Sequence, residues 1–129
     1  MGRWHGRIAS DWVSHALGDF KMSDRTHLSP ILDEMLDMEG VKYIFYRCPG
    51  CNEHHWIPVT GSKAWQFDGN LESPTVTPSV KHTCKYGDDT PDSVCHYFIR
   101  AGRLEYCGDC THNLAGQTVP MPQLSEGNT

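Results

Sequence analysis

The sequence predicts an α+β fold, a small β-rich domain of antiparallel hairpins with one N-terminal helix. Apolar and polar residues alternate with a period of two in residues 41–59 and 95–107, which is typical of strands. The first stretch contains Cys48-Pro49-Gly50-Cys51, and the second ends in Cys107-Gly108-Asp109-Cys110. Two CxxC turns at hairpin tips are typical of zinc ribbons, because each turn aims two thiols at one point.

The chain has 129 residues, enough for one domain with a modest core, and we divide it into three parts. Residues 1–28 are expected to be weakly ordered, residues 29–122 to form a zinc-stabilised β-rich domain, and residues 123–129 to be a flexible tail. No apolar run approaches the roughly 18 residues of a membrane span, and no signal peptide is recognisable. Six cysteines without a secretory signal predict a reducing compartment and metal binding.

A helix is predicted immediately before the first hairpin. Ser29 is a candidate N-cap, Pro30 fits the first helical position, and Gly40 would end the helix. The apolar residues between them recur at helical spacing and predict one buried stripe: Ile31, Leu32, Met35, Leu36 and Met38.

Strands follow this segment. Residues 41–46 and 55–59 are predicted to pair as a hairpin that carries the first CxxC turn at its tip. Residues 65–70 indicate a short strand and a turn. Residues 74–80 are expected to be extended and, because they contain two prolines, to lie at a sheet edge or in a loop. The polar residues 84–93 predict a surface loop.

The second hairpin is the clearest local signal. Residues 95–100 and 103–107 flank Ala101-Gly102, a two-residue loop of the length that joins paired strands. Pairing of Arg100 with Arg103 places His96 opposite Cys107. It also predicts one buried face: Cys95, Tyr97, Ile99, Leu104 and Tyr106.

The cysteines predict about one Zn²⁺ per chain. Cys48 and Cys51 supply two ligands, while spacing alone makes Cys107 and Cys110 the other pair. The hairpin register brings further donors to the same place, and these alternatives stay open because one tetrahedral site takes four ligands. The alternates are Cys95, His96, His55 and His112, with Cys84 the weakest candidate. A redox role is disfavoured, because β-prone residues rather than a helix follow the first CxxC turn.

A polar cluster beside the cysteines offers a catalytic alternative: His55, His96, Asp109 and His112. These residues suit acid–base chemistry or a second metal, as in a metal-dependent hydrolase or nuclease. They equally suit hydrogen bonding to the metal ligands. Neither an HExxH motif nor the zinc-deaminase order is present, and no serine has the sequence context of a nucleophile elbow.

The order of motifs resembles a family of small phage and prophage zinc-binding proteins of unknown function, often labelled "ammonia monooxygenase" in genomes. The resemblance covers roughly residues 44–122 and rests on Cys48-Pro-Gly-Cys51-x3-His55, Trp65-x-Phe-Asp-Gly69, Pro74-Thr-x-x-Pro78-Ser79, Cys95-His96-x-Phe98, Gly102 and Asp109-Cys110-x-His112-x-Leu-Ala-Gly116. An apolar residue often stands at the position of Cys107 in such relatives. The resemblance therefore implies Cys48, Cys51, Cys95 and Cys110 as ligands, and a bacterial cytoplasm as the location.

The sequence and the resemblance together predict a zinc-binding phage or prophage accessory protein that binds a host or phage protein, for example in counter-defence. This hypothesis favours a binding protein over an enzyme but leaves enzymatic activity open, with a metal-dependent hydrolase or nuclease as the alternative. A zinc-ribbon nucleic-acid binder is a third reading, which the formal charge of -5 disfavours. No membrane association is expected, and the sequence does not indicate an oligomeric state.

Overall fold

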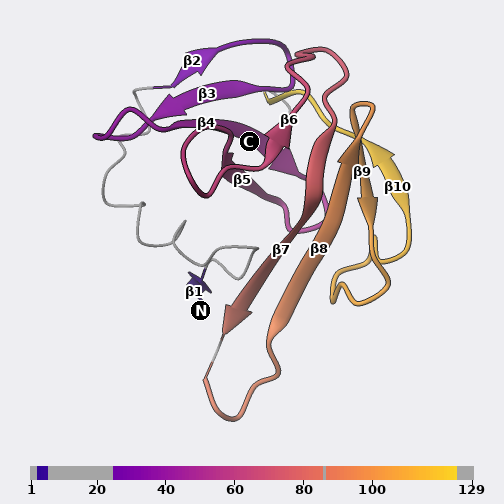
Figure 1. The fold of residues 1–129 in the computed structure, drawn as a ribbon. Coiled ribbons are helices and arrows are strands. Elements are labelled where there is room, and N and C mark those ends of the chain that lie inside the picture. Colours follow the sequence, from indigo (N-terminus) through magenta and orange to yellow (C-terminus); the bar gives the residue numbers. More distant parts are fainter. Residues whose placement is uncertain (1–2, 6–24, 86, 125–129) are drawn as a thin grey trace.

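The computed structural model describes residues 3–5, 25–85 and 87–124, which form two antiparallel sheets (Figure 1). The first sheet has the order β1-β7-β8-β9-β10, and β6 also pairs with β7: β1 (Arg3–His5), β6 (Gln66–Phe67), β7 (Val76–Lys85), β8 (Ser93–Arg100), β9 (Arg103–Tyr106) and β10 (Thr118–Pro120). The second sheet has the order β2-β3-β4-β5: β2 (Thr26–His27), β3 (Asp33–Leu36), β4 (Lys42–Cys48) and β5 (Glu53–Pro58).

The predicted α+β class is wrong, because the elements of the described residues are all strands. Where the N-terminal helix was expected, Ser29 does cap the chain: its Oγ accepts from the backbone N–H groups of Ile31 and Leu32. A tight turn follows, however, and the chain then enters β3. Leu32 packs in the core between the sheets and Met35 in a second cluster, so the apolar residues serve two packing surfaces rather than one helical stripe.

Both predicted hairpins are confirmed. In β4–β5, Tyr46 pairs with His55 and the CxxC turn lies at the tip. In β8–β9, Arg100 pairs with Arg103, and the loop residues Ala101 and Gly102 both adopt positive φ, as a tight hairpin turn of matching twist requires.

Strand β7 is longer than the extended segment expected at residues 74–80, and it pairs on both sides. Its register with β8 is irregular between Val76 and Val80, and Pro78 lies in this irregularity, where a missing N–H costs no regular ladder bond. The polar loop therefore starts later than expected, and Cys84 belongs to the strand as a buried residue.

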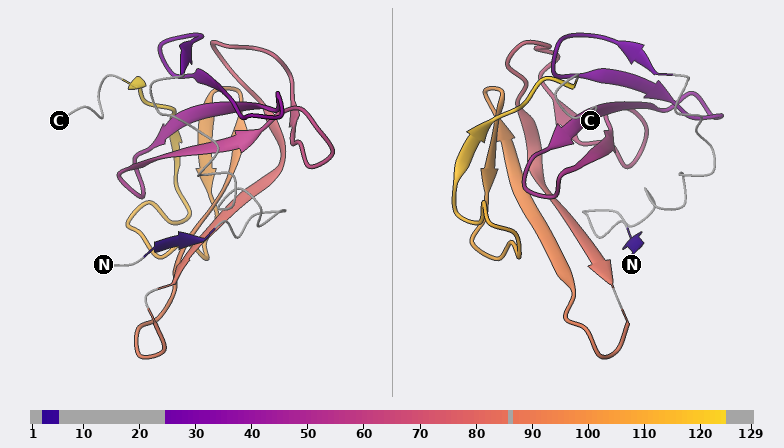
Figure 2. Two further views of the ribbon diagram at one scale, coloured as in Figure 1. Left: turned by 90° about the vertical axis from the view of Figure 1, so that its left-hand side faces the viewer. Right: turned by 180° about the vertical axis from the view of Figure 1, so that it is seen from behind.

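The main core lies between the two sheets, whose strands cross steeply in the turned views (Figure 2). It is formed by Leu32, which directly precedes β3, and by inward-facing residues of both sheets: Ile44, Tyr46, Ile57, Val80, Tyr97, Ile99 and Leu104. The buried face predicted for the second hairpin is confirmed by these positions together with Cys95 and Tyr106. The metal ligand candidates thus enter the core directly from the strands that build it.

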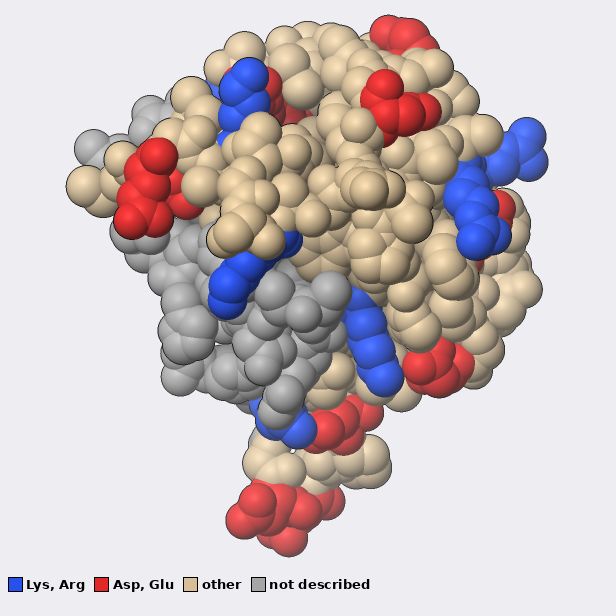
Figure 3. Space-filling model, viewed as in Figure 1, with Lys and Arg blue, Asp and Glu red and all other residues tan. Residues whose placement is uncertain are grey.

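The β7–β8 hairpin projects beyond the body and ends in an exposed loop that carries Asp88 and Asp89, visible as the red tip in Figure 3. The expected weakly ordered segment 1–28 and tail 123–129 lie largely outside the described residues. In the part of the chain that the structure describes, no helix has the length and apolarity needed to cross a membrane.

A candidate metal centre and a candidate catalytic triad

Four donors from three strands and one turn converge in the core beneath the first CxxC turn. Cys48 ends β4, Cys51 lies in the turn, His55 is in β5 and Cys95 is in β8. One donor atom of each lies within 4.8 Å of the other three. The turn closes because Asn52, directly after Cys51, adopts a left-handed conformation with φ of 56°.

The spacing and charge of these donors fit a bound metal ion. The Sγ atoms of Cys48 and Cys95 are 3.6 Å apart, close to the edge of about 3.8 Å expected for a tetrahedron with Zn–S distances of ~2.3 Å. Hydrogen bonds from the Cys51 and Cys95 thiols lower the pKa of Cys48, and the same contacts raise the pKa of Cys51 and of Cys95. Without a metal, only one of the three neighbouring thiols is favoured as a thiolate. A divalent cation would allow all three to lose their protons, because its charge balances theirs.

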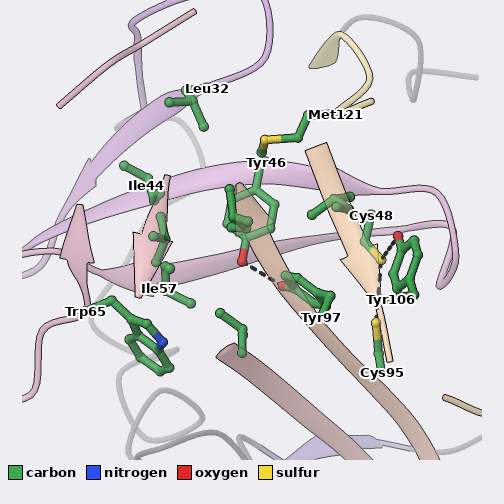
Figure 4. Packing of buried hydrophobic residues seen from close by; sticks show 14 of the residues in the cluster. Leu32, Ile44, Tyr46, Cys48, Ile57, Trp65, Cys95, Tyr97, Tyr106 and Met121 are labelled. Atoms are coloured by element: carbon green, nitrogen blue, oxygen red, sulfur yellow. Dashed lines mark hydrogen bonds between the residues drawn. The ribbon is translucent and has the colours of Figure 1, made fainter. Parts of the chain in front are cut away.

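Tyr106 and His112 support this cluster from outside. The Tyr106 hydroxyl lies 3.0 Å from Cys48 Sγ (Figure 4). It also accepts a hydrogen bond from the Gly50 N–H at 3.2 Å. The His112 ring stands edge-on to the Tyr106 ring, with centroids 4.6 Å apart. Gly50 admits this ring, since a Cβ at that position would overlap the His112 imidazole. Outer contacts of this kind orient the ligands of metal sites in proteins.

A buried polar chain runs away from the cluster through the core. The Tyr97 hydroxyl lies 2.6 Å from that of Tyr46 (Figure 4). It also lies 3.1 Å from His82 Nε2. His82 in turn stacks on His55 at a centroid distance of 4.0 Å. Burial raises the pKa of both tyrosines and lowers the pKa of His82, so all three groups are neutral near pH 7.

The remaining cysteines take other places. Cys110, expected as a ligand, lies outside the four-donor cluster and brackets the backbone of His96: its Sγ accepts from the His96 N–H at 3.2 Å and donates to the His96 carbonyl at 3.1 Å. Cys107 lies opposite His96, as its register predicted, with its N–H donating to the His96 carbonyl at 2.8 Å. His55, an alternate ligand in the sequence, occupies the fourth position of the cluster.

A second constellation lies on the outer face of the first sheet. Ser79 Oγ of β7 is 3.0 Å from His96 Nε2 of β8, and His96 Nδ1 is 3.1 Å from Asp109 Oδ1 in the turn after β9. A carboxylate only accepts hydrogen bonds, so the Nδ1 atom carries the proton and Nε2 is free to accept the serine proton. This is the arrangement of a Ser–His–Asp catalytic triad.

The charges around Asp109 favour its ionised form. Burial acts to raise the pKa of this carboxyl, but the hydrogen bond and charge of His96 together with the nearby Lys81 ammonium outweigh it, and the net pKa is lowered. Lys81 Nζ lies 3.7 Å from Asp109 Oδ2. Asp109 is thus held as the anion that orients His96 and stabilises its protonated state.

The four polar residues singled out in the sequence separate into two sites. His96 and Asp109 come together, whereas His55 joins the cysteines and His112 lies beside Tyr106. The sequence reasoning missed Ser79, because it looked for a serine at a sharp strand-to-helix turn. The sequence does place Pro78-Ser79 in an extended segment. Only the pairing of β7 with β8, however, shows that Ser79 lies beside His96.

Comparisons with known proteins give one positive result. A family model described as "Bacterial ubiquitination-like system serine protease (BubE)" matches residues 22–107, well over half of the chain, while no curated protein and no solved structure matches. The match contains Ser79 and His96 and ends two residues before Asp109. The phage and prophage origin implied by the motif resemblance has no support among these findings. The chain belongs to the BubE family of bacterial ubiquitination-like system serine proteases.

Proposed function

We propose that this chain is a serine protease that acts on a protein substrate of a bacterial ubiquitination-like system, with Ser79 as the nucleophile. The single observation that supports this most strongly is the hydrogen-bond chain Ser79–His96–Asp109, at 3.0 and 3.1 Å. The family description names the same chemistry independently of that geometry. The protein partner expected from the sequence is then the substrate.

The proposed reaction is acyl transfer in two steps. Ser79 Oγ attacks the scissile carbonyl while His96 Nε2 removes its proton, and the protonated imidazole then gives that proton to the leaving group. Water hydrolyses the resulting ester on Ser79 with His96 again as the base. Asp109 keeps Nδ1 protonated, which fixes the tautomer that each step needs.

The metal is proposed to be Zn²⁺ with a structural role. Cys48, Cys51, His55 and Cys95 would hold it, because four protein donors are the number that a structural zinc site takes. The ion would tie the β4–β5 hairpin to β8 and so fix the strand that carries His96. This arrangement disfavours the metal-dependent hydrolase alternative. The triad residues are not ligands of the four-donor cluster, so the proposed reaction does not use its metal.

The proposed place of action is the bacterial cytoplasm. All six cysteines are free thiols in the structure, and five of them lie in the four-donor cluster or beside His96, as expected in a reducing compartment. Nucleic acid remains a disfavoured partner because of the net charge of -5.

A fluorophosphonate probe tests the assignment of Ser79 directly, since it phosphonylates activated serines: the serine oxygen bonds to phosphorus and fluoride leaves. The zinc-loaded chain is incubated with the probe, and intact mass and peptide mapping then locate the label. We expect one label on Ser79, loss of labelling in Ser79→Ala and in His96→Ala, and normal labelling in the matched control Ser93→Ala on β8. A label elsewhere, or no label on folded, metal-loaded protein, contradicts the proposal.

A further inference from the structure

Cys107 is held beside the triad but has no part in it. Its N–H donates to the His96 carbonyl at 2.8 Å, and its own carbonyl accepts from the N–H groups of Cys110 and Gly116 at 3.3 Å each. One donor atom from each of His96, Cys107 and Asp109 lies within 4.8 Å of the other two. An imidazole, a thiol and a carboxylate therefore converge on one point at the partly exposed outer face of the sheet.

We infer that His96, Cys107 and Asp109 bind a second transition-metal ion and that this ion switches the protease off. Three protein donors of these types with a position open to solvent match the ligand set that Zn²⁺ and similar ions accept. The site differs from the four-donor cluster in both residues and burial. The binding inference stands on this geometry alone, whereas its effect on activity rests on the proposed function.

The switch follows from the proton balance at His96. In the working triad, Nδ1 carries the proton and Nε2 accepts from Ser79. Coordination uses the lone pair of Nδ1, so the ring proton moves to Nε2 and the Cys107 thiol releases its proton to solvent. Nε2–H has no lone pair for the serine proton, and Asp109 now faces the ion instead of the imidazole. The base is lost while the fold stays intact.

Lys81 sets the affinity of this second site. Its ammonium lies 3.7 Å from Asp109 Oδ2 and opposes a cation at the same carboxylate. The site is consequently weak compared with the four-donor cluster, and we expect it to fill only when free metal rises. Removal of the Lys81 charge should therefore increase the affinity of this site for the metal. Side chains that do not bind a metal would show no such increase.

Calorimetric titration of Zn²⁺ into full-length chain already loaded with one structural ion tests the inference without relying on activity. Wild type and Ser79→Ala are expected to bind one additional ion. Cys107→Ser should weaken that binding by more than about tenfold, and Lys81→Gln should tighten it several-fold. Cys84→Ala, which removes a cysteine outside both clusters, is the control and should match wild type.

Activity is followed in the same titration as the ratio of labelling rates with and without added Zn²⁺. We expect this ratio to fall as the second ion binds to wild type and to stay near one for Cys107→Ser over the same range. Absence of a second ion in wild type, or unchanged binding in Cys107→Ser, overturns the inference. Binding without inhibition overturns the switch alone, and binding in a chain that never labels overturns the proposed function but leaves the site standing.

Discussion

Cys95 and His96 are consecutive residues of β8 whose side chains point to opposite faces of the sheet, one to the metal cluster and the other to the triad. Cys95 Sγ lies 3.6 Å from Cys48 Sγ in the core, and His96 Nε2 lies 3.0 Å from Ser79 Oγ on the outer face. Alternation along a strand enforces this division. The position of His96, the proposed general base, is therefore coupled to the proposed metal site on the other face of the sheet.

Metal removal should abolish both folding cooperativity and serine reactivity. Elemental analysis should give about one zinc per chain, and a strong chelator should remove the cooperative melt, because a structural zinc site contributes on the order of 10 kcal/mol of binding energy. Serine labelling should disappear at the same chelator concentration, since Cys95 no longer fixes β8. Metal-free protein with an unchanged melt would refute this coupling.

The fourth ligand is decided by a pair of variants. His55→Ala removes a donor of the four-residue cluster and should release the metal, whereas Cys110→Ser should retain it because that thiol lies at the His96 backbone. The measurement is zinc content after gel filtration. Zinc-free Cys110→Ser protein beside zinc-loaded His55→Ala protein would restore the ligand set implied by the motif resemblance.

Asp109→Asn should lower the rate at which the fluorophosphonate probe labels Ser79 by about 10²- to 10⁴-fold with little change in the melt. The amide presents a donor to Nδ1 and favours the wrong tautomer of His96, the effect known for such triads. Stability should change little because Asp109 is about half exposed. The control is Asp92→Asn, which removes a carboxylate that pairs with Lys85 in the β7–β8 hairpin, away from the triad. Equal labelling rates in the two variants would remove Asp109 from the triad.

Tyr97→Phe should destabilise the protein by about 1–3 kcal/mol, because it leaves the Tyr46 hydroxyl and His82 Nε2 buried without their shared partner. Denaturant unfolding of zinc-loaded protein measures this. The matched control is Tyr43→Phe, whose hydroxyl bonds the more exposed Asp37 and should cost less. A larger loss in Tyr43→Phe would show that the buried chain carries little stability.

Gly50→Ala should weaken metal binding, because the new Cβ displaces the His112 ring and, through it, Tyr106 from Cys48. The double variant Gly50→Ala/His112→Ala tests that route, as removal of the ring should recover part of the lost affinity. Competition with a chromogenic chelator reports the affinity of each variant. Identical losses in the single and double variants would place the effect of Gly50 in the backbone instead.

The local signals of the sequence predicted the two hairpins well, because alternation and the Ala101-Gly102 turn are short-range properties. They failed at residues 29–39, where Ser29 caps a turn but Leu36 and Met38 are exposed at 48% and 84%. The apolar residues of this segment recur at helical spacing, but the segment forms a turn and a strand, in which that spacing does not define one buried face. Cys48, Cys51 and Cys95 were singled out from sequence, and the structure brings all three together.

The triad could be predicted only in part. His96 and Asp109 stood out as polar residues beside cysteines, yet their partner Ser79 is set by the pairing of β7 with β8, a contact between strands separated by a loop. The register irregularity at Pro78 makes this pairing unpredictable by counting residues. The place of His55 among the thiols likewise depends on how two sheets pack, which periodicity does not encode.

The four-donor cluster joins two parts of the chain: β2 to β5 form one sheet, and β6 to β10 form the other sheet together with β1. Cys48, Cys51 and His55 come from the first half, and Cys95 comes from the second, with the exposed loop around Gly61 between them. A chain cut in that loop would yield two fragments, each with an incomplete ligand set and the second with the whole triad. If the proposed zinc site and the proposed triad both hold, reassembly of the two fragments would require zinc, and the pair would report free metal by recovering serine reactivity.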